Sequence, residues 1–317
     1  MRASRESGAG AADVSPYHAP YDVPYQEPER SLPPCRKGPG DDAPSGLRSR
    51  VAHGVRAYGL IAVMWVRSTL AYRASFAMTA FGNFAASGLD FVAILLMFSQ
   101  VDVLGGYTLP EVALLYGSAA TAFGVADLLM GSMSRLGQRI RDGTLDTLLV
   151  RPVPVLAQVA ADRFALRRLG RIVQGALVLG YGLTASPIDW TWLKALTVAL
   201  MLLSGSTIFV AVLVACAAFQ FVAQDAAEVE ASFTYGGNTL LQYPPTVFAK
   251  ELVRGVTFIV PLAFVSWLPA LYLLDRPYPL DLPRWLAWMP PLVALACCAL
   301  ASAAWRAGLS SYRSTGS

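Results

Sequence analysis

Six apolar stretches, each about as long as a bilayer is thick, constrain this 317-residue chain more than any other feature. A transmembrane helix needs about 20 consecutive apolar residues. Only 15% of the residues are charged, against roughly a quarter in soluble domains. The sequence therefore predicts an all-α membrane protein with six transmembrane helices. The expected spans are residues 76–99, 111–131, 164–184, 193–222, 253–274 and 285–305.

The first 50 residues have a different composition from the rest of the chain. They hold eight prolines, scattered charges and no apolar run. Such a segment cannot bury enough surface to order itself, so residues 1–50 are expected to form a disordered cytoplasmic tail. We expect no cleavable signal peptide, because no apolar region followed by a small-residue cleavage site is present.

Residues 51–75 are apolar but interrupted by arginines. Arg56 and Arg67 are eleven residues apart, which is too short a gap to span a bilayer but close to three helical turns. The two arginines therefore share one face of a helix, with Leu60 and Met64 on the opposite side. This pattern predicts an interfacial helix over 51–75 that lies on the membrane and begins a transmembrane domain of residues 51–317.

Lysines and arginines are distributed unevenly between the segments that connect the spans. If the N-terminus is inside, 22 of the 25 basic residues lie in cytoplasmic segments, and the exceptions are Lys194, Arg276 and Arg284. The positive-inside rule then predicts that both termini are cytoplasmic. Residues 223–252 fall on the cytoplasmic side in this scheme, as either a second amphipathic element or a plain linker.

Motifs for nucleotide binding and hydrolysis are missing. The chain has no GxxxxGK[ST] phosphate loop and no HExxH, and its histidines are His18 and His53. We therefore expect no enzyme, no cofactor or metal bound by this chain, and no nucleic-acid partner. A channel or transporter subunit is the more typical function for six spans without such motifs.

The stretch IRDGTLDTLLVRPVP, residues 140–154, is compact and charged in a largely apolar chain. Asp142 and Gly143 offer a turn and a helix start, and the proline at 152 disfavours helix in the residue before it. These signals predict a helix of about two turns from Thr144 to Val150.

Leu145, Leu148 and Leu149 lie at i, i+3 and i+4 of that helix, which makes one apolar face. An isolated helix of two turns is marginal in water, so another surface must hold it. Docking into a groove of a second protein is one interpretation. The other is a solvated, positively charged loop whose leucines rest on the membrane surface.

The same stretch resembles the cytoplasmic loop of permease subunits of type-2 ATP-binding-cassette exporters, in which a segment similar to I-R-x-G-x-L-D-x-x-L-x-R-P joins the second and third spans. The C-terminus WRAGLSSYRSTGS, the pair Tyr243-Pro244 and the stretch FIVPLAFVSWLPALYLL at 258–274 are similar to that family as well. The resemblance covers residues 55–317 and leaves the tail unmatched.

The resemblance implies a six-span permease of a bacterial plasma membrane that pairs with a second permease, identical or different. Two separate ATPase subunits, which use ATP and Mg, would dock on the loop over 132–163. Leu145 and Leu149 would enter the ATPase groove, Asp146 would form an ion pair, and Gly143 would permit the tight turn. Arg151 would form a second ion pair. The matching positions are Arg141, Gly143, Leu145, Asp146, Leu149, Arg151 and Pro152.

Asp90 lies near the middle of the first expected span, where an aspartate costs about 2.5–3.5 kcal/mol on insertion scales. Asn83 is seven residues earlier, two turns away on nearly the same face. Either these residues line a substrate path between subunits, or they make internal hydrogen bonds to a neighbouring helix.

Two other functions compete with the ATP-driven exporter. In a proton-coupled secondary transporter, Asp90 would relay the proton, although the sequence shows no clear internal repeat. In a structural membrane protein, Asp90 would have no evident purpose. The transported substrate is not encoded in any recognisable motif.

Overall fold

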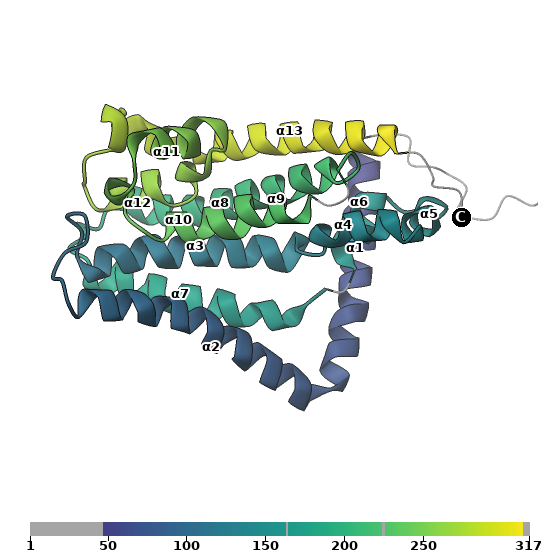
Figure 1. Cartoon of the computed structure of the whole chain (residues 1–317), viewed down its shortest axis with the longest axis horizontal. Helices are drawn as coiled ribbons and strands as arrows, with labels where there is room; N and C mark the ends of the chain where they lie inside the picture. The colour runs from purple at the N-terminus through teal and green to yellow at the C-terminus, as the bar shows by residue number, and fades with distance from the viewer. Residues whose placement is uncertain (1–46, 163, 224–225, 313–317) are drawn as a thin grey trace, which may run out of the picture. The chain divides into compact units, whose positions relative to one another are not determined.

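The computed structural model describes residues 47–162, 164–223 and 226–312, and these ranges contain helices and no strand. The predicted all-α class is confirmed (Figure 1). The predicted tail over 1–50 lies almost entirely outside the described residues. The α-helices are α1 (Leu47–Ala71), α2 (Arg73–Phe98), α3 (Leu109–Met130), α4 (Leu136–Arg141), α5 (Thr144–Leu149), α6 (Val155–Ala161), α7 (Leu169–Ala185), α8 (Trp192–Phe219), α9 (Ala227–Ala231), α10 (Gly237–Leu241), α11 (Lys250–Arg254), α12 (Trp267–Leu273) and α13 (Pro290–Ser311).

Short 3-10 and π segments connect or extend these helices. They are η1 (Met133–Arg135), η2 (Leu166–Arg168), η3 (Ser232–Gly236), η4 (Pro245–Val247), η5 (Gly255–Ile259), η6 (Leu262–Phe264), η7 (Pro279–Asp281) and η8 (Arg284–Trp288). Of these, η3 and η5 are π-helical and continue α9 and α11 without a break.

Among the described residues, the helices α2, α3, α8 and α13 are each long and apolar enough to cross a membrane. They correspond to the predicted first, second, fourth and sixth spans, with α13 beginning five residues later than expected. The third predicted span is α7, which has 17 residues. That length corresponds to about 26 Å, at the short end of what crosses a hydrocarbon core.

Helix α3 is the most enclosed of the long helices and packs against α7 and α8. Glycines bring α3 and α7 into backbone contact. A Cβ added at Gly117 would lie 2.3 Å from the backbone nitrogen of Leu179, and one at Gly182 would lie 2.5 Å from that of Leu114. Small residues at a helix crossing allow this approach in membrane proteins, where close packing drives association. On its other side, α8 packs along α13.

The segment after α8 runs back along α3. Near its start, Glu230 accepts a hydrogen bond from Gln220 Nε2 (2.9 Å), and Gln220 Oε1 accepts one from the backbone nitrogen of Gly137, just beyond the end of α3 (2.6 Å). Past its end, Thr246 Oγ1 donates to the carbonyl of Gly105, just before α3 begins (2.8 Å). The continuous run of α9, η3 and α10 therefore lies beside α3 (Figure 1).

The predicted fifth span over 253–274 is not one helix. Its two halves, α11 with η5 and η6 with α12, are bent by 82°. Pro261 lies in the break, where the proline ring removes a backbone donor and interrupts the helix. Just beyond the bend, Ser266 Oγ donates to the carbonyl of Leu115 (3.1 Å), which is well inside α3.

Both ends of this bent pair lie at the end of the molecule where α3 begins. The pair follows Thr246 on one side, and after α12 the Asp275 carboxylate contacts Lys194 Nζ at the start of α8 (2.6 Å). The pair therefore begins and ends on one side of the long helices, and we call it the re-entrant hairpin. The basic residues on that side become Lys194, Lys250, Arg254, Arg276 and Arg284, five of the 25 in the chain, so the charge bias keeps its direction.

The predicted span over 253–274 is bent instead of straight, and the predicted cytoplasmic element over 223–252 contains the helical run of α9, η3 and α10. Which of these two segments crosses a membrane stays a prediction. Hydropathy cannot distinguish a helix that faces lipid from one enclosed by protein, and Trp267 and Leu271 in α12 are fully buried. Glu230 makes the segment of α9, η3 and α10 look polar in the sequence, although its carboxylate is buried and hydrogen-bonded within the protein.

Buried ion pairs hold the helix ends together on the side of the re-entrant hairpin. The Arg276 guanidinium donates two hydrogen bonds to the Glu111 carboxylate, at 2.9 and 3.0 Å. Glu111 also closes a capping box with Thr108 at the start of α3. The pair thus joins the segment after α12 to the first turn of α3.

Arg276→Ala leaves the Glu111 carboxylate, whose side chain is only 4% exposed, without its counter-charge. We expect a loss of stability on the order of 2 kcal/mol, since breaking a buried pair is costly but Arg276 is partly exposed. Thermal unfolding in detergent measures it. Arg284→Ala removes the same charge from an exposed 4.0 Å pair and should change little. Equal effects of the two variants would contradict the special role of Arg276.

The predicted interfacial helix is present as α1, which runs crosswise to the long helices (Figure 1). Its Tyr58 hydroxyl donates to the carbonyl of Leu129 at the end of α3 (2.8 Å). Leu60 and Met64 are exposed, as an apolar face directed at a membrane surface would be. The position of α1 in that surface stays a prediction.

Candidate functional site in the loop between α3 and α7

Between α3 and α7 the chain folds into η1, α4, α5 and α6, which pack on the last turns of α8 and α13. Their apolar side chains form a hydrophobic cluster of their own, which we call the loop core. It consists of Met133, Leu136, Ile140, Leu145, Leu148, Val159 and Ala160 with Ala211, Val214, Ala217, Ala218, Phe221, Ala301 and Trp305. The interpretation as a solvated loop with leucines on the membrane is therefore wrong for Leu145 and Leu148.

The two-turn helix predicted from the charged stretch is confirmed as α5. Gly143 precedes it with φ +66°, the left-handed conformation that favours glycine and permits the tight turn from α4. The helix ends at Leu149, three residues before the proline at 152. Gln158 Nε2 donates to the carbonyls of Leu148 (3.0 Å) and Val153 (2.8 Å), so a side chain of α6 caps the end of α5.

The leucines of α5 point in two directions. Leu145 is fully buried in the loop core, whereas Leu149 is 40% exposed and the following Val150 is 88% exposed. The structure contradicts the predicted groove contact for Leu145, because that side chain is enclosed by its own chain. Leu149 and Val150 form the exposed apolar edge of α5, which we call the α5 edge.

Asp146 connects α5 to the end of α13. Its carboxylate accepts a hydrogen bond from the Tyr312 hydroxyl (2.9 Å), and the Tyr312 ring meets Phe221 edge-on. Burial raises the pKa of Tyr312, and the Asp146 carboxylate raises it further, so the hydroxyl remains protonated and donates. Two separate stretches of the sequence, the loop motif and the C-terminal WRAGLSSY, are thus brought into contact.

The remaining loop residues singled out from the sequence lie on the surface. Arg141, Arg151 and Pro152 are exposed. The Pro152 carbonyl is 3.4 Å from Nε2 of His53 in α1, so the segment after α5 touches the interfacial helix.

Ion pairs anchor both arms of the loop. Arg139 in α4 pairs with Asp162, just after α6. Arg168, at the end of η2, contacts the Asp127 carboxylate (3.1 Å) and donates to the Asp127 carbonyl (2.6 Å) in the last turn of α3. The loop is therefore fixed to the helices on either side, with the α5 edge at its surface.

A family model described as ABC-2 family transporter protein matches residues 84–316, well over half of the chain. The chain belongs to the ABC-2 transporter family. No curated protein and no solved structure matches it. The match includes the loop core, the re-entrant hairpin and most of α2, and it leaves α1 outside. An ABC-2 protein is the membrane component of an ABC transporter, and its family implies partnership with an ABC ATPase.

In this ABC-2 transporter, Asn83 and Asp90 do not reach a neighbouring helix. Asn83 Nδ2 donates to the carbonyl of Thr79 in its own helix (3.0 Å). Asp90 is exposed and makes no hydrogen bond or ion pair with any residue that the structure describes. The alternative of an internal hydrogen bond between helices is therefore not realised among the residues that the structure describes.

Sequence reasoning missed the link between the loop and the segment formed by α9, η3 and α10. Gln220 bridges Gly137 at the start of α4 to Glu230 in α9. The signal was a glutamate in an apolar chain, which is a candidate functional group once its segment is placed in the membrane. Among the described residues, no group of three His, Cys, Asp or Glu could hold a metal.

Proposed function

We propose that this chain is the permease subunit of an ABC exporter of the bacterial plasma membrane. In this proposal the chain crosses the membrane six times, and both termini lie in the cytoplasm. The six crossings are α2, α3, α7, α8, the α9–α10 segment and α13. Two copies of a separate ATPase supply the energy from ATP and Mg. They bind at the loop between α3 and α7, on the side where positive charge is concentrated.

The observation that carries this proposal is the α5 edge. Leu149 and Val150 are exposed on a helix whose opposite face is fixed in the loop core. An apolar ridge that is both accessible and rigidly supported suits insertion into a groove of another protein. The neighbouring cationic groups Arg141 and Arg151 are exposed and supply charge for the rim of that contact.

A second permease, identical or different, completes the transporter. Only 11% of the most apolar stretch of α2 is buried within the chain, and Met78, Phe81 and Leu89 are among its exposed side chains. On this proposal α2 faces the second permease, and Asn83 and Asp90 line the substrate route between the subunits.

Co-expression with a candidate ABC ATPase, sought among the neighbouring genes, tests the assignment. We expect the two proteins to co-purify and inside-out vesicles to accumulate substrate only when ATP and Mg are supplied. An ATPase that co-purifies but drives uptake into right-side-out vesicles would reject export while keeping the ABC partnership.

Asp90→Asn separates the exporter from a proton-coupled carrier. If ATP drives transport and Asp90 lines the route, the variant changes substrate selectivity or rate but ATP remains essential. In a proton-coupled carrier, the transport rate of the Asp90→Asn variant would no longer depend on the pH gradient across the membrane. Transport rates measured across pH, with and without ATP, distinguish the two. Unchanged transport in every condition would remove Asp90 from the route.

A further inference from the structure

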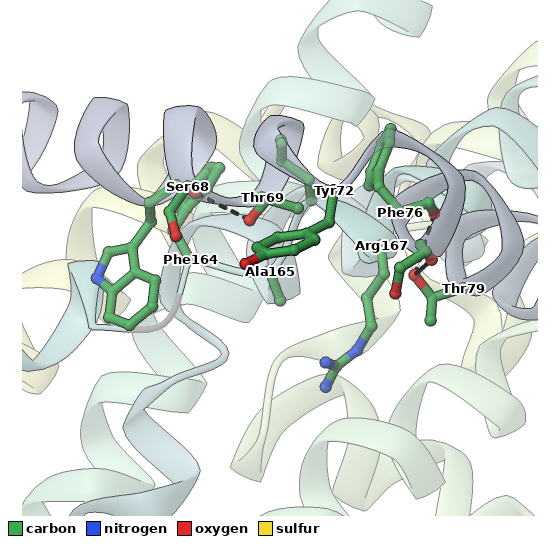
Figure 2. A pocket seen from close by; sticks show the side chains of 11 residues that line it. Ser68, Thr69, Tyr72, Phe76, Thr79, Phe164, Ala165 and Arg167 are labelled. Atoms are coloured by element: carbon green, nitrogen blue, oxygen red, sulfur yellow. Dashed lines mark hydrogen bonds between the residues drawn. The ribbon is translucent and has the colours of Figure 1, made fainter.

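A pocket of about 450 Å³ opens where α1 turns into α2 (Figure 2). One wall comes from the end of α1 and the start of α2, and the other comes from the residues before α7. Its lining combines aromatic rings, hydroxyl groups and one guanidinium: Trp65, Tyr72, Phe76 and Phe164 with Ser68, Thr69, Ser75, Thr79 and Arg167. No described part of the loop core or of the α5 edge contributes to it.

The polar groups in this pocket favour an anion. Among the described residues, Arg167 is the only charged one that lines the pocket, and none of the described lining residues carries a carboxylate. Within the described ranges, Arg167 makes no ion pair, and the hydroxyl groups of Ser68 and Ser75 make no hydrogen bond, although the Ser75 carbonyl accepts one from Thr79 Oγ1. In Figure 2 the Arg167 side chain starts between Tyr72 and Thr79, and its guanidinium extends away from both. A guanidinium with nearby hydroxyl donors is a common arrangement for binding phosphate.

The start of α2 adds to the same preference. Its first turn contains no acidic residue, and its N-cap residue Tyr72 makes no side-chain capping hydrogen bond. The backbone N–H groups at a helix N-terminus attract anions. Tyr72, Ser75 and Phe76 all line the pocket, so the first turn of α2 borders the same space as Arg167.

The location of the pocket specifies the kind of anion. α2 is one of the four helices long and apolar enough to cross a membrane, and the pocket lies at its first turns. α1 presents exposed apolar side chains beside it, and the exposed Arg67 and Arg73 flank the turn. Aromatic and basic side chains gather where the headgroups of a bilayer lie.

We propose that the pocket at the turn between α1 and α2 binds the phosphate headgroup of an anionic glycerophospholipid from the cytoplasmic leaflet. Arg167 and the free hydroxyls hold the phosphate, and Trp65, Tyr72 and Phe164 pack against the glycerol and the upper acyl chains. A bound lipid then bridges the interfacial helix to the residues before α7.

Native mass spectrometry and thermal unfolding of the full-length chain in mild detergent test this site. The probes are phosphatidylglycerol, a diacylglycerol with the same acyl chains, and inorganic phosphate. We expect retention of one phosphatidylglycerol with a raised Tm, and little retention of diacylglycerol. Arg167→Ala should weaken phosphatidylglycerol binding about tenfold, the loss expected for one charge-assisted contact. Ser75→Trp should block it by filling the pocket.

Arg306→Ala is the matched control, since it removes an exposed arginine from α13, away from the pocket. It should retain phosphatidylglycerol like the unmodified chain. Equal retention by Arg167→Ala and Arg306→Ala overturns the site. Equal retention of diacylglycerol shows that the acyl chains alone bind and overturns headgroup recognition. Full displacement of the lipid by millimolar inorganic phosphate identifies a site for free anions and overturns the lipid proposal.

Discussion

Leu149→Asp is expected to abolish co-purification of the partner ATPase while the permease itself stays folded. The side chain is 40% exposed and lies outside the loop core, so a carboxylate there costs the isolated chain little. In an apolar groove of the ATPase, the same carboxylate loses its water without gaining a partner. That costs on the order of 3 kcal/mol or more, over a hundredfold in Kd. Affinity purification from co-expressing cells measures the loss.

Thr147→Asp is the matched control for Leu149→Asp. It places the same charge on an exposed position of the same two-turn helix, away from the α5 edge. It should retain the ATPase. If Leu149→Asp retains both assembly and transport, the α5 edge is not the docking surface. If both variants lose the ATPase equally, added charge rather than the Leu149 contact is responsible.

Gly117→Ala is expected to destabilise the whole transporter although it adds one methyl group. That methyl would lie 2.3 Å from the backbone nitrogen and 2.5 Å from the Cα of Leu179. Since both atoms belong to the backbone of α7, no rotamer change relieves the contact, and the helices must separate. We expect a loss of about 3 kcal/mol or more, at the upper end for overpacked cores. Thermal unfolding followed by size-exclusion chromatography measures it.

Gly180→Ala makes the same substitution in α7 at a position with nothing within 4 Å of the new methyl group. It should be neutral, or stabilising by up to about 1 kcal/mol through helix propensity. A destabilisation equal to that of Gly117→Ala would mean that glycine matters for helix flexibility rather than for the contact between α3 and α7.

The parts of the fold that local signals specify could be predicted from the sequence. Gly143 and the proline at 152 bracket α5, and the structure begins and ends the helix within a residue or two of the expected bounds. The long apolar helices could be predicted as well, because the length and hydropathy of each segment indicate a helix without reference to the rest of the chain.

The re-entrant hairpin and the direction of Leu145 could not be predicted, because both depend on distant neighbours. Ser266 in the hairpin bonds to the Leu115 carbonyl of α3, 151 positions away. Leu145 and Leu149 are equivalent in the local pattern, and only the packing of α8 and α13 against one face separates them. The contact between Asp146 and Tyr312 is likewise invisible in either motif alone.

The loop core determines how force would travel through the protein. A closely packed interior has low compressibility and passes displacement on instead of absorbing it. Leu145 and Leu148 pack among side chains of α8 and α13. A force applied at the α5 edge would therefore displace these helices instead of only deforming the loop. The displacement would act on the ends of α8 and α13 at the same time, so α5 would move together with both helices.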